Sequence, residues 1–71
     1  MFDNYLLIIG KKIKKIRLKN NLTIYELGKK SKLSKNTIIK IEKGGANPTI
    51  KTLNKLTRAL KIRINSLTED L

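Results

Sequence analysis

Hydrophobic residues recur along the chain at helical spacing, in segments separated by short polar breaks. In the first segment the apolar side chains follow one another at steps of three and four residues, at Leu6, Ile9, Ile13 and Ile16. This spacing places them on one face of a helix. Asparagine tolerates the left-handed conformation at a helix end, so we expect this first helix to stop at Asn20 and Asn21.

A capping box opens the second helical segment. Thr23 precedes Glu26 by one helical turn. The threonine hydroxyl can therefore accept from a backbone N–H, while the carboxylate reaches back to the N–H of Thr23. We expect a short helix that ends near Ser31 and turns Leu27 inward.

The next segment, residues 34–45, permits two interpretations. Several of its residues are β-branched, which favours a strand, namely Thr37, Ile38, Ile39 and Ile41. As a strand, however, it alternates poorly between apolar and polar side chains, and no β-rich hairpin partner lies nearby. Ser34 is a good N-cap, and Gly44 suits the left-handed position just past a helix C-terminus. A helix is therefore predicted, with Ile38 and Ile41 on its buried face.

Two further helices are expected after the Gly-Gly-Ala-Asn-Pro break at residues 44–48. Thr49 can cap a fourth helix, whose apolar stripe would consist of Ile50, Leu53, Leu56 and Leu60. A second capping box, Ser-Leu-Thr-Glu at residues 66–69, would open a last turn that runs to Leu71. The pattern contains no linker or repeat, so it predicts one compact all-α domain of five helices.

Composition excludes several classes of function. The chain has 71 residues, which make a single domain, residues 1–71, with a small core. It contains no cysteine and no histidine, so it lacks disulfides and the commonest metal ligand and general base. Its five Asp and Glu residues lie mostly near the ends or in caps and form no catalytic constellation. We therefore expect no enzyme, metal, cofactor or small-molecule ligand.

The positive charge of the chain favours an anionic partner. Seventeen Lys and Arg residues stand against five Asp and Glu, a net charge of +12. Nucleic acid is the first candidate for this partner and an anionic membrane surface is the second. Alternatively, the lysines form a solvated surface with no partner, or their number reflects the codon bias of an AT-rich genome. The longest apolar run, residues 5–9, is too short to span a bilayer, and no signal-peptide cleavage site follows it. A cytoplasmic protein is therefore expected.

The two short middle helices match a helix-turn-helix unit over residues 23–43, whose second helix enters the DNA major groove. Residues 9–62 resemble the Cro/repressor-type (XRE-like) helix-turn-helix family in the segments IGKKIKKIRLKNNLT, ELGKKSKLSKNTIIKIEKG and NPTIKTLNKLTRAL. The resemblance implies a lambda-repressor-like fold that binds double-stranded DNA. Gly28 stands where this family uses Ala or Gly so that the two helices approach closely.

The resemblance also assigns roles to side chains of the third helix. The residues expected to read base edges are Lys35, Asn36, Ile39 and Lys40. Lysine can donate to guanine, asparagine can pair with adenine, and isoleucine can contact a thymine methyl group. A phosphate contact or a solvated face is the alternative for the lysines, and peripheral core packing is the alternative for Ile39. Phosphate contacts are expected from Thr37, Lys43 and Asn47, although Asn47 can equally be a turn residue before Pro48.

By the same resemblance, Arg17 and Glu42 form a partly buried ion pair that joins the first helix to the third. Two positions depart from the family pattern. Ile24 replaces a glutamine that commonly contacts phosphate, which makes that contact doubtful. Lys32 stands in the turn where glycine is common, and a left-handed conformation would cost about 1–2 kcal/mol there.

Domains of this type usually act as two-fold dimers on inverted repeats. The apolar residues expected at the homodimer interface are Ile62, Ile64, Leu67 and Leu71, and burial against the first helix is the alternative. The chain leaves no room for a ligand-sensing domain. We therefore expect a stand-alone, autoregulatory transcription factor, with RNA polymerase as a further partner if it activates.

Several kinds of regulator share this architecture. A restriction-modification controller protein or a phage-type repressor fits best, whereas an antitoxin would need a toxin-binding segment that is not evident. A membrane-active protein is a more distant alternative, because residues 5–20 read alone as a basic amphipathic helix. The downstream caps and the helix-turn-helix spacing, which a membrane peptide does not need, argue against it.

Overall fold

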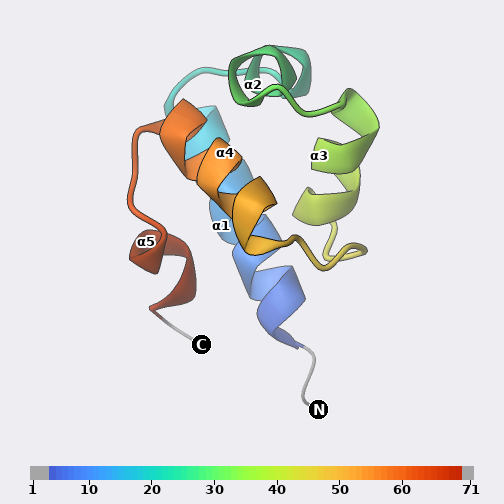
Figure 1. The fold of residues 1–71 in the computed structure, drawn as a ribbon, viewed down its shortest axis with the longest axis vertical. Coiled ribbons are helices and arrows are strands. Elements are labelled where there is room, and N and C mark those ends of the chain that lie inside the picture. Colours follow the sequence, from blue (N-terminus) through green and yellow to red (C-terminus); the bar gives the residue numbers. More distant parts are fainter. Residues whose placement is uncertain (1–3, 70–71) are drawn as a thin grey trace.

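The computed structural model describes residues 4–69, and within this range the chain forms helices and no strand. The helices are α1 (Asn4–Lys19), α2 (Ile24–Ser31), α3 (Lys35–Glu42), α4 (Ile50–Leu60) and α5 (Asn65–Thr68). α1 packs against α3 and α5, while α2 packs against α3 and α4. Figure 1 shows α3 and α5 on opposite sides of α1 and α4. The predicted all-α, five-helix fold is confirmed.

Local sequence signals set the starts of the three middle helices. A hydroxyl group caps each of them by accepting from a backbone N–H three residues later, with Thr23 capping α2, Ser34 capping α3 and Thr49 capping α4. The β-branched third segment is a helix, as predicted, and Gly44 follows it with φ of +76°. Capping and the left-handed glycine therefore outweigh the strand propensity of the isoleucines.

The start of α5 differs from the prediction. α5 begins at Asn65, and no side chain caps it, so the capping box predicted at residues 66–69 is wrong. The first amides of α5 are instead satisfied by a backbone turn, in which Ser66 donates to Arg63 at 3.0 Å and Leu67 donates to Ile64 at 2.9 Å. Leu71, where the last turn was expected to end, lies outside the described residues.

Apolar residues from every helix form the core. They are Ile9, Ile13, Leu27, Ile38, Ile41, Leu53, Leu56, Leu60 and Leu67. The predicted stripe of α4 is wrong at Ile50, whose side chain is 66% exposed. Ile50 is the first residue of α4, at the edge of the bundle, where no other helix covers it. None of the described helices is long and apolar enough to cross a membrane.

Gly10 allows α1 to lie directly against the last turn of α3. A Cβ atom at Gly10 would be 2.8 Å from the carbonyl oxygen of Glu42 and closer still to that of Ile41. Any side chain here would collide with backbone that is held in a helix. The sequence pattern assigned no role to Gly10, although a glycine inside a helical pattern is a known sign of close packing.

Candidate nucleic-acid interface

The turn between α2 and α3 is tight and carries one strained residue. Lys32 ends α2 with φ of +61°, so the left-handed conformation expected from family resemblance is present and costs about 1–2 kcal/mol for a lysine. The carbonyl of Gly28 accepts from the N–H of Leu33 at 3.0 Å. A Cβ atom at Gly28 would lie 2.9 Å from the carbonyl oxygen of Leu33, which agrees with the close approach expected there.

α3 buries one face and presents the other to solvent. Ile38 and Ile41 are 0% and 2% exposed. The side chains expected to read bases, Lys35, Asn36 and Lys40, are all exposed. At about 100° per residue, positions 35, 36 and 40 fall within an arc of roughly 140° around the helix axis, so the structure brings these three side chains to one accessible face.

Ile39 lies between Lys35 and Asn36 around the axis of α3 and is half-buried. It lines a hollow of about 140 Å³ together with Ile24, Lys14, Lys43 and the side chains of Arg17 and Glu42. Ile39 is thus partly covered, yet it adjoins the exposed Lys40 and Lys43. Both alternatives raised for Ile39 remain compatible with this position.

The residues expected to contact phosphate are dispersed around α3. Thr37 is half-buried, and its hydroxyl lies 2.8 Å from the hydroxyl of Ser34 within the N-terminal cap. Lys43 is exposed immediately after α3, and Asn47 is exposed in the loop that leads to α4. Thr37 and Lys43 therefore lie toward the two ends of α3, whereas Asn47 lies outside this helix in the loop that follows.

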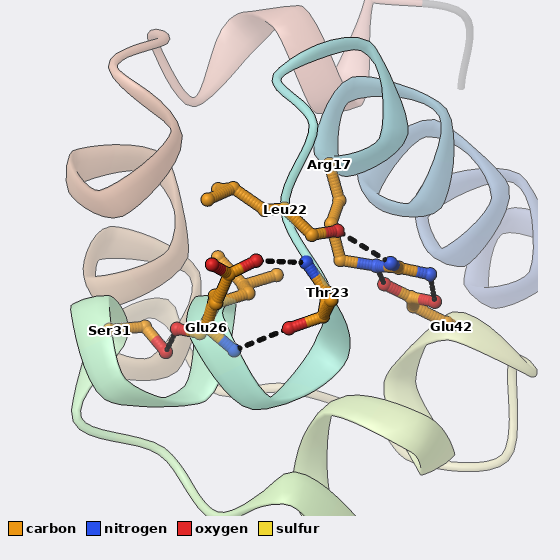
Figure 2. A network of polar contacts seen from close by, with 7 residues as sticks. Arg17, Leu22, Thr23, Glu26, Ser31 and Glu42 are labelled. Atoms are coloured by element: carbon orange, nitrogen blue, oxygen red, sulfur yellow. Dashed lines mark hydrogen bonds and ion pairs between the residues drawn. The ribbon is translucent and has the colours of Figure 1, made fainter.

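A buried ion pair holds α3 in place. Arg17 donates from Nε to Glu42 Oε2 at 2.7 Å and from Nη2 to Glu42 Oε1 at 3.0 Å, and the two side chains are 7% and 6% exposed. The third guanidinium nitrogen of Arg17, Nη1, donates to the carbonyl oxygen of Leu22 at 2.8 Å. Figure 2 shows how the guanidinium thereby joins α1, the loop before α2, and α3. The pair that resemblance implied is present and almost fully buried.

The capping box of α2 lies beside this pair (Figure 2). The N–H of Thr23 donates to Glu26 Oε1 at 2.8 Å, and the N–H of Glu26 donates to Thr23 Oγ1 at 3.0 Å. The backbone N–H of Thr23 is the largest cause that lowers the pKa of Glu26 below its ordinary 4.5, followed by the Thr23 side chain, with a smaller effect of the Lys30 charge. The carboxylate thus stabilises the fold when it is ionised.

We expect the stability of the domain to depend on the titration of Glu26. Because its pKa is lower in the folded state, the stabilisation is present above 4.5 and is lost as pH falls through the lowered value. Urea unfolding at about pH 6 and about pH 3 should show a smaller pH effect in Glu26→Gln than in wild type. Thr23→Ala keeps the backbone hydrogen bond and should keep most of the pH effect. An identical pH effect in Glu26→Gln and wild type would contradict this role.

The residues expected at a dimer interface occupy different environments. Ile62 and Ile64 are half-buried against the core. Leu67 is fully buried, because α5 packs on α1 and turns this side chain into the core. The expectation that Leu67 contacts a second chain is therefore wrong, and the alternative of burial within the domain applies to it. Leu71 lies outside the described residues.

Comparison with known proteins agrees with this geometry. Residues 13–67 match the helix-turn-helix family. The immunity repressor protein of Bacillus phage phi105 is 34% identical over 59 residues, which are 83% of this chain but only 41% of the repressor. The chain thus spans about two fifths of that relative.

Solved structures of controller proteins have the same fold. The restriction-modification controller protein C.AhdI from Aeromonas hydrophila superposes with a TM-score of 0.85 at 26% identity, over 87% of this chain and 94% of C.AhdI. The controller protein C.Esp1396I, solved as a tetramer with its natural 35 base-pair operator, gives a TM-score of 0.84 at 33% identity, over 99% of this chain and 90% of that one. The chain therefore belongs to the helix-turn-helix family, a non-enzymatic family, and is a DNA-binding transcriptional regulator.

Proposed function

We propose that this protein reads a specific sequence in double-stranded DNA through α3 and binds inverted-repeat operators as a homodimer. It would regulate its own gene, as a controller protein or a phage-type repressor does. One observation carries the proposal: Lys35, Asn36 and Lys40 are exposed together on a helix whose opposite face is buried. The similarity to C.Esp1396I, which was solved on its operator, supports it.

The chemistry of these side chains suits base edges in the major groove. The side-chain amide of Asn36 can donate from its nitrogen to N7 of adenine and accept at its oxygen from N6 of the same base. Lys35 and Lys40 can donate to O6 and N7 of guanine. The short α3 is held by the ion pair of Arg17 with Glu42, so that these donors and acceptors approach the duplex in one orientation.

The charge of the chain supplies the rest of the affinity. A net charge of +12 attracts a duplex before any base is read, and contacts to phosphates position the helix without selecting a sequence. The proposed phosphate contacts are Thr37 in the first turn of α3, Lys43 immediately after it, and Asn47 in the loop that follows. This part of the affinity should fall steeply as salt rises.

The homodimer is proposed to form through the segment that joins α4 to α5. Ile62 and Ile64 lie there and retain part of their apolar surface. A two-fold dimer would present two copies of α3 to successive major grooves, about 34–36 Å apart. If the protein activates transcription, RNA polymerase would be a further partner.

The test is binding to the duplex upstream of its own gene, compared with a shuffled duplex, across a salt series. We expect a preference of about 10³ or more that persists as salt rises, with two chains per inverted repeat. Asn36→Ala should cost about 1–3 kcal/mol of binding free energy and relax the preference at one base pair. Lys19→Ala, an exposed lysine at the end of α1, is the control and should leave the preference unchanged. Equal binding to both duplexes would exclude sequence reading.

A further inference from the structure

Beside α3 lies a hollow whose lining residues, apart from Lys35, have no part in the proposed reading of bases. This hollow of about 320 Å³, which we name the turn hollow, is lined by Tyr25, Gly28, Lys29, Lys32, Leu33 and Lys35. The side chain of Tyr25 is 63% exposed. The Nζ atom of Lys29 lies 5.6 Å from the centroid of its ring. This distance is within the range of a cation–π interaction, which holds the ammonium group at the hollow.

The turn hollow is positively charged on several sides. Lys29 comes from α2, Lys32 from the turn, and Lys35 from the first position of α3. None of the described residues that line it is acidic. A concave surface lined by charges of one sign concentrates ions of the opposite sign. The chemistry of the hollow therefore suits an anion, with the Tyr25 hydroxyl as an additional hydrogen-bond donor.

Lys32 carries its charge on a residue with left-handed backbone conformation. Its φ of +61° is a conformation that glycine adopts without strain and lysine does not. The chain nevertheless carries a lysine here, and its side chain lines the turn hollow.

The turn hollow is continuous with the candidate DNA interface, because Lys35 belongs to both. We propose that the turn hollow grips the sugar–phosphate backbone of the same duplex, beside the base pairs read by α3. Lys29 and Lys32 donate to phosphate oxygens, and so does the hydroxyl of Tyr25. This inference rests on the proposed function of α3, since it requires a duplex at that helix.

Salt-dependent binding tests the proposal. The double variant Lys29→Gln/Lys32→Gly should reduce the slope of log affinity against log salt by about two. Its affinity should fall equally on operator and shuffled duplexes, so that the ratio between them stays the same. Lys32→Gly alone should bind DNA more weakly while its melting temperature rises, because strain is removed together with the charge. A purely structural role for Lys32 would not produce this opposite pair of effects.

Further variants separate the contributions. Tyr25→Phe keeps the ring beneath Lys29 but removes the hydroxyl, so affinity should fall roughly ten-fold with no change in salt slope. Lys30→Gln is the matched control, because Lys30 lies on α2 but lines a different hollow, and its effect on the slope should be clearly smaller. Ethylation of single phosphates should weaken DNA binding by wild type at one or two positions per half-site. Ethylation at those positions should leave DNA binding by the double variant unchanged.

The outcomes distinguish this proposal from the proposed function. If the double variant keeps the affinity and salt slope of wild type, the proposal is overturned, and an acidic protein surface becomes the better partner for the hollow. If wild type prefers no duplex sequence, the proposed function fails. The salt slope of the double variant on shuffled DNA would then still decide whether the turn hollow contacts phosphate.

Discussion

Glu42→Ala is expected to lower the free energy of unfolding by about 3–5 kcal/mol, because it leaves the guanidinium of Arg17 buried without its counter-charge. The carboxylate accepts two hydrogen bonds from Arg17, and both side chains are almost fully buried. At roughly 0.05–0.15 kcal/mol per residue, a domain of 71 residues is stable by about 4–11 kcal/mol, so the variant should lose a large part of its stability. Urea unfolding followed by circular dichroism measures the loss.

Matched variants show whether the buried charge is the cause. Replacing both partners by apolar residues, in Arg17→Met/Glu42→Leu, should recover much of the stability, because no charge is then left unpaired. Glu69→Ala removes an exposed carboxylate and should change stability by about 0.5 kcal/mol or less. If Glu42→Ala melts with wild type, the ion pair makes no contribution to stability and our interpretation of it is incorrect.

Gly10→Ala is expected to destabilise the domain by about 3 kcal/mol, although alanine is the better helix former by about 1 kcal/mol. The added methyl group would collide with the carbonyl oxygens of Ile41 and Glu42, which belong to helical backbone and cannot rotate away. α1 and α3 would have to separate. Because α3 carries the proposed base-reading residues, DNA binding should weaken as well.

Gly45→Ala is the matched control for this substitution. A Cβ atom there would have Lys40 as its near neighbour, at an ordinary contact distance of 3.6 Å from the carbonyl oxygen. Its melting temperature should therefore remain close to that of wild type, while that of Gly10→Ala falls. A melting temperature of Gly10→Ala equal to or above that of wild type would show that the α1–α3 contact yields without cost.

The helices were predictable where the signal is local. Thr23, Ser34 and Thr49 each cap the helix that follows, because an N-cap acts on amides only two or three residues away. The same holds for Gly44, whose conformational freedom ends α3 whatever packs around it. α5 was misplaced, since its first amides bond to backbone carbonyls of residues 63 and 64 and need no side-chain signal.

The candidate site was predictable only in part. The exposed face of α3 follows from helical periodicity, so the positions of Lys35, Asn36 and Lys40 agree with those expected. The pairing of Arg17 with Glu42 was implied by family resemblance, because no local rule joins residues so distant in the chain. The turn hollow was not predicted: the pattern assigned no role to Tyr25 or Lys29, because only the turn brings Lys32 and Lys35 beside them.

The sequence by itself thus determined which segments are helical and where three of them start, and its charge favoured an anionic partner. Tertiary structure alone decided which apolar side chains are covered. Leu67 and Ile50 are both apolar residues of short helical segments, yet Leu67 is fully buried and Ile50 is 66% exposed. The physical reason is that periodicity assigns a residue to a face of its own helix, whereas burial requires a second helix against that face. That second helix comes from a distant part of the chain, as α1 does for Leu67 and as α3 does for Gly10.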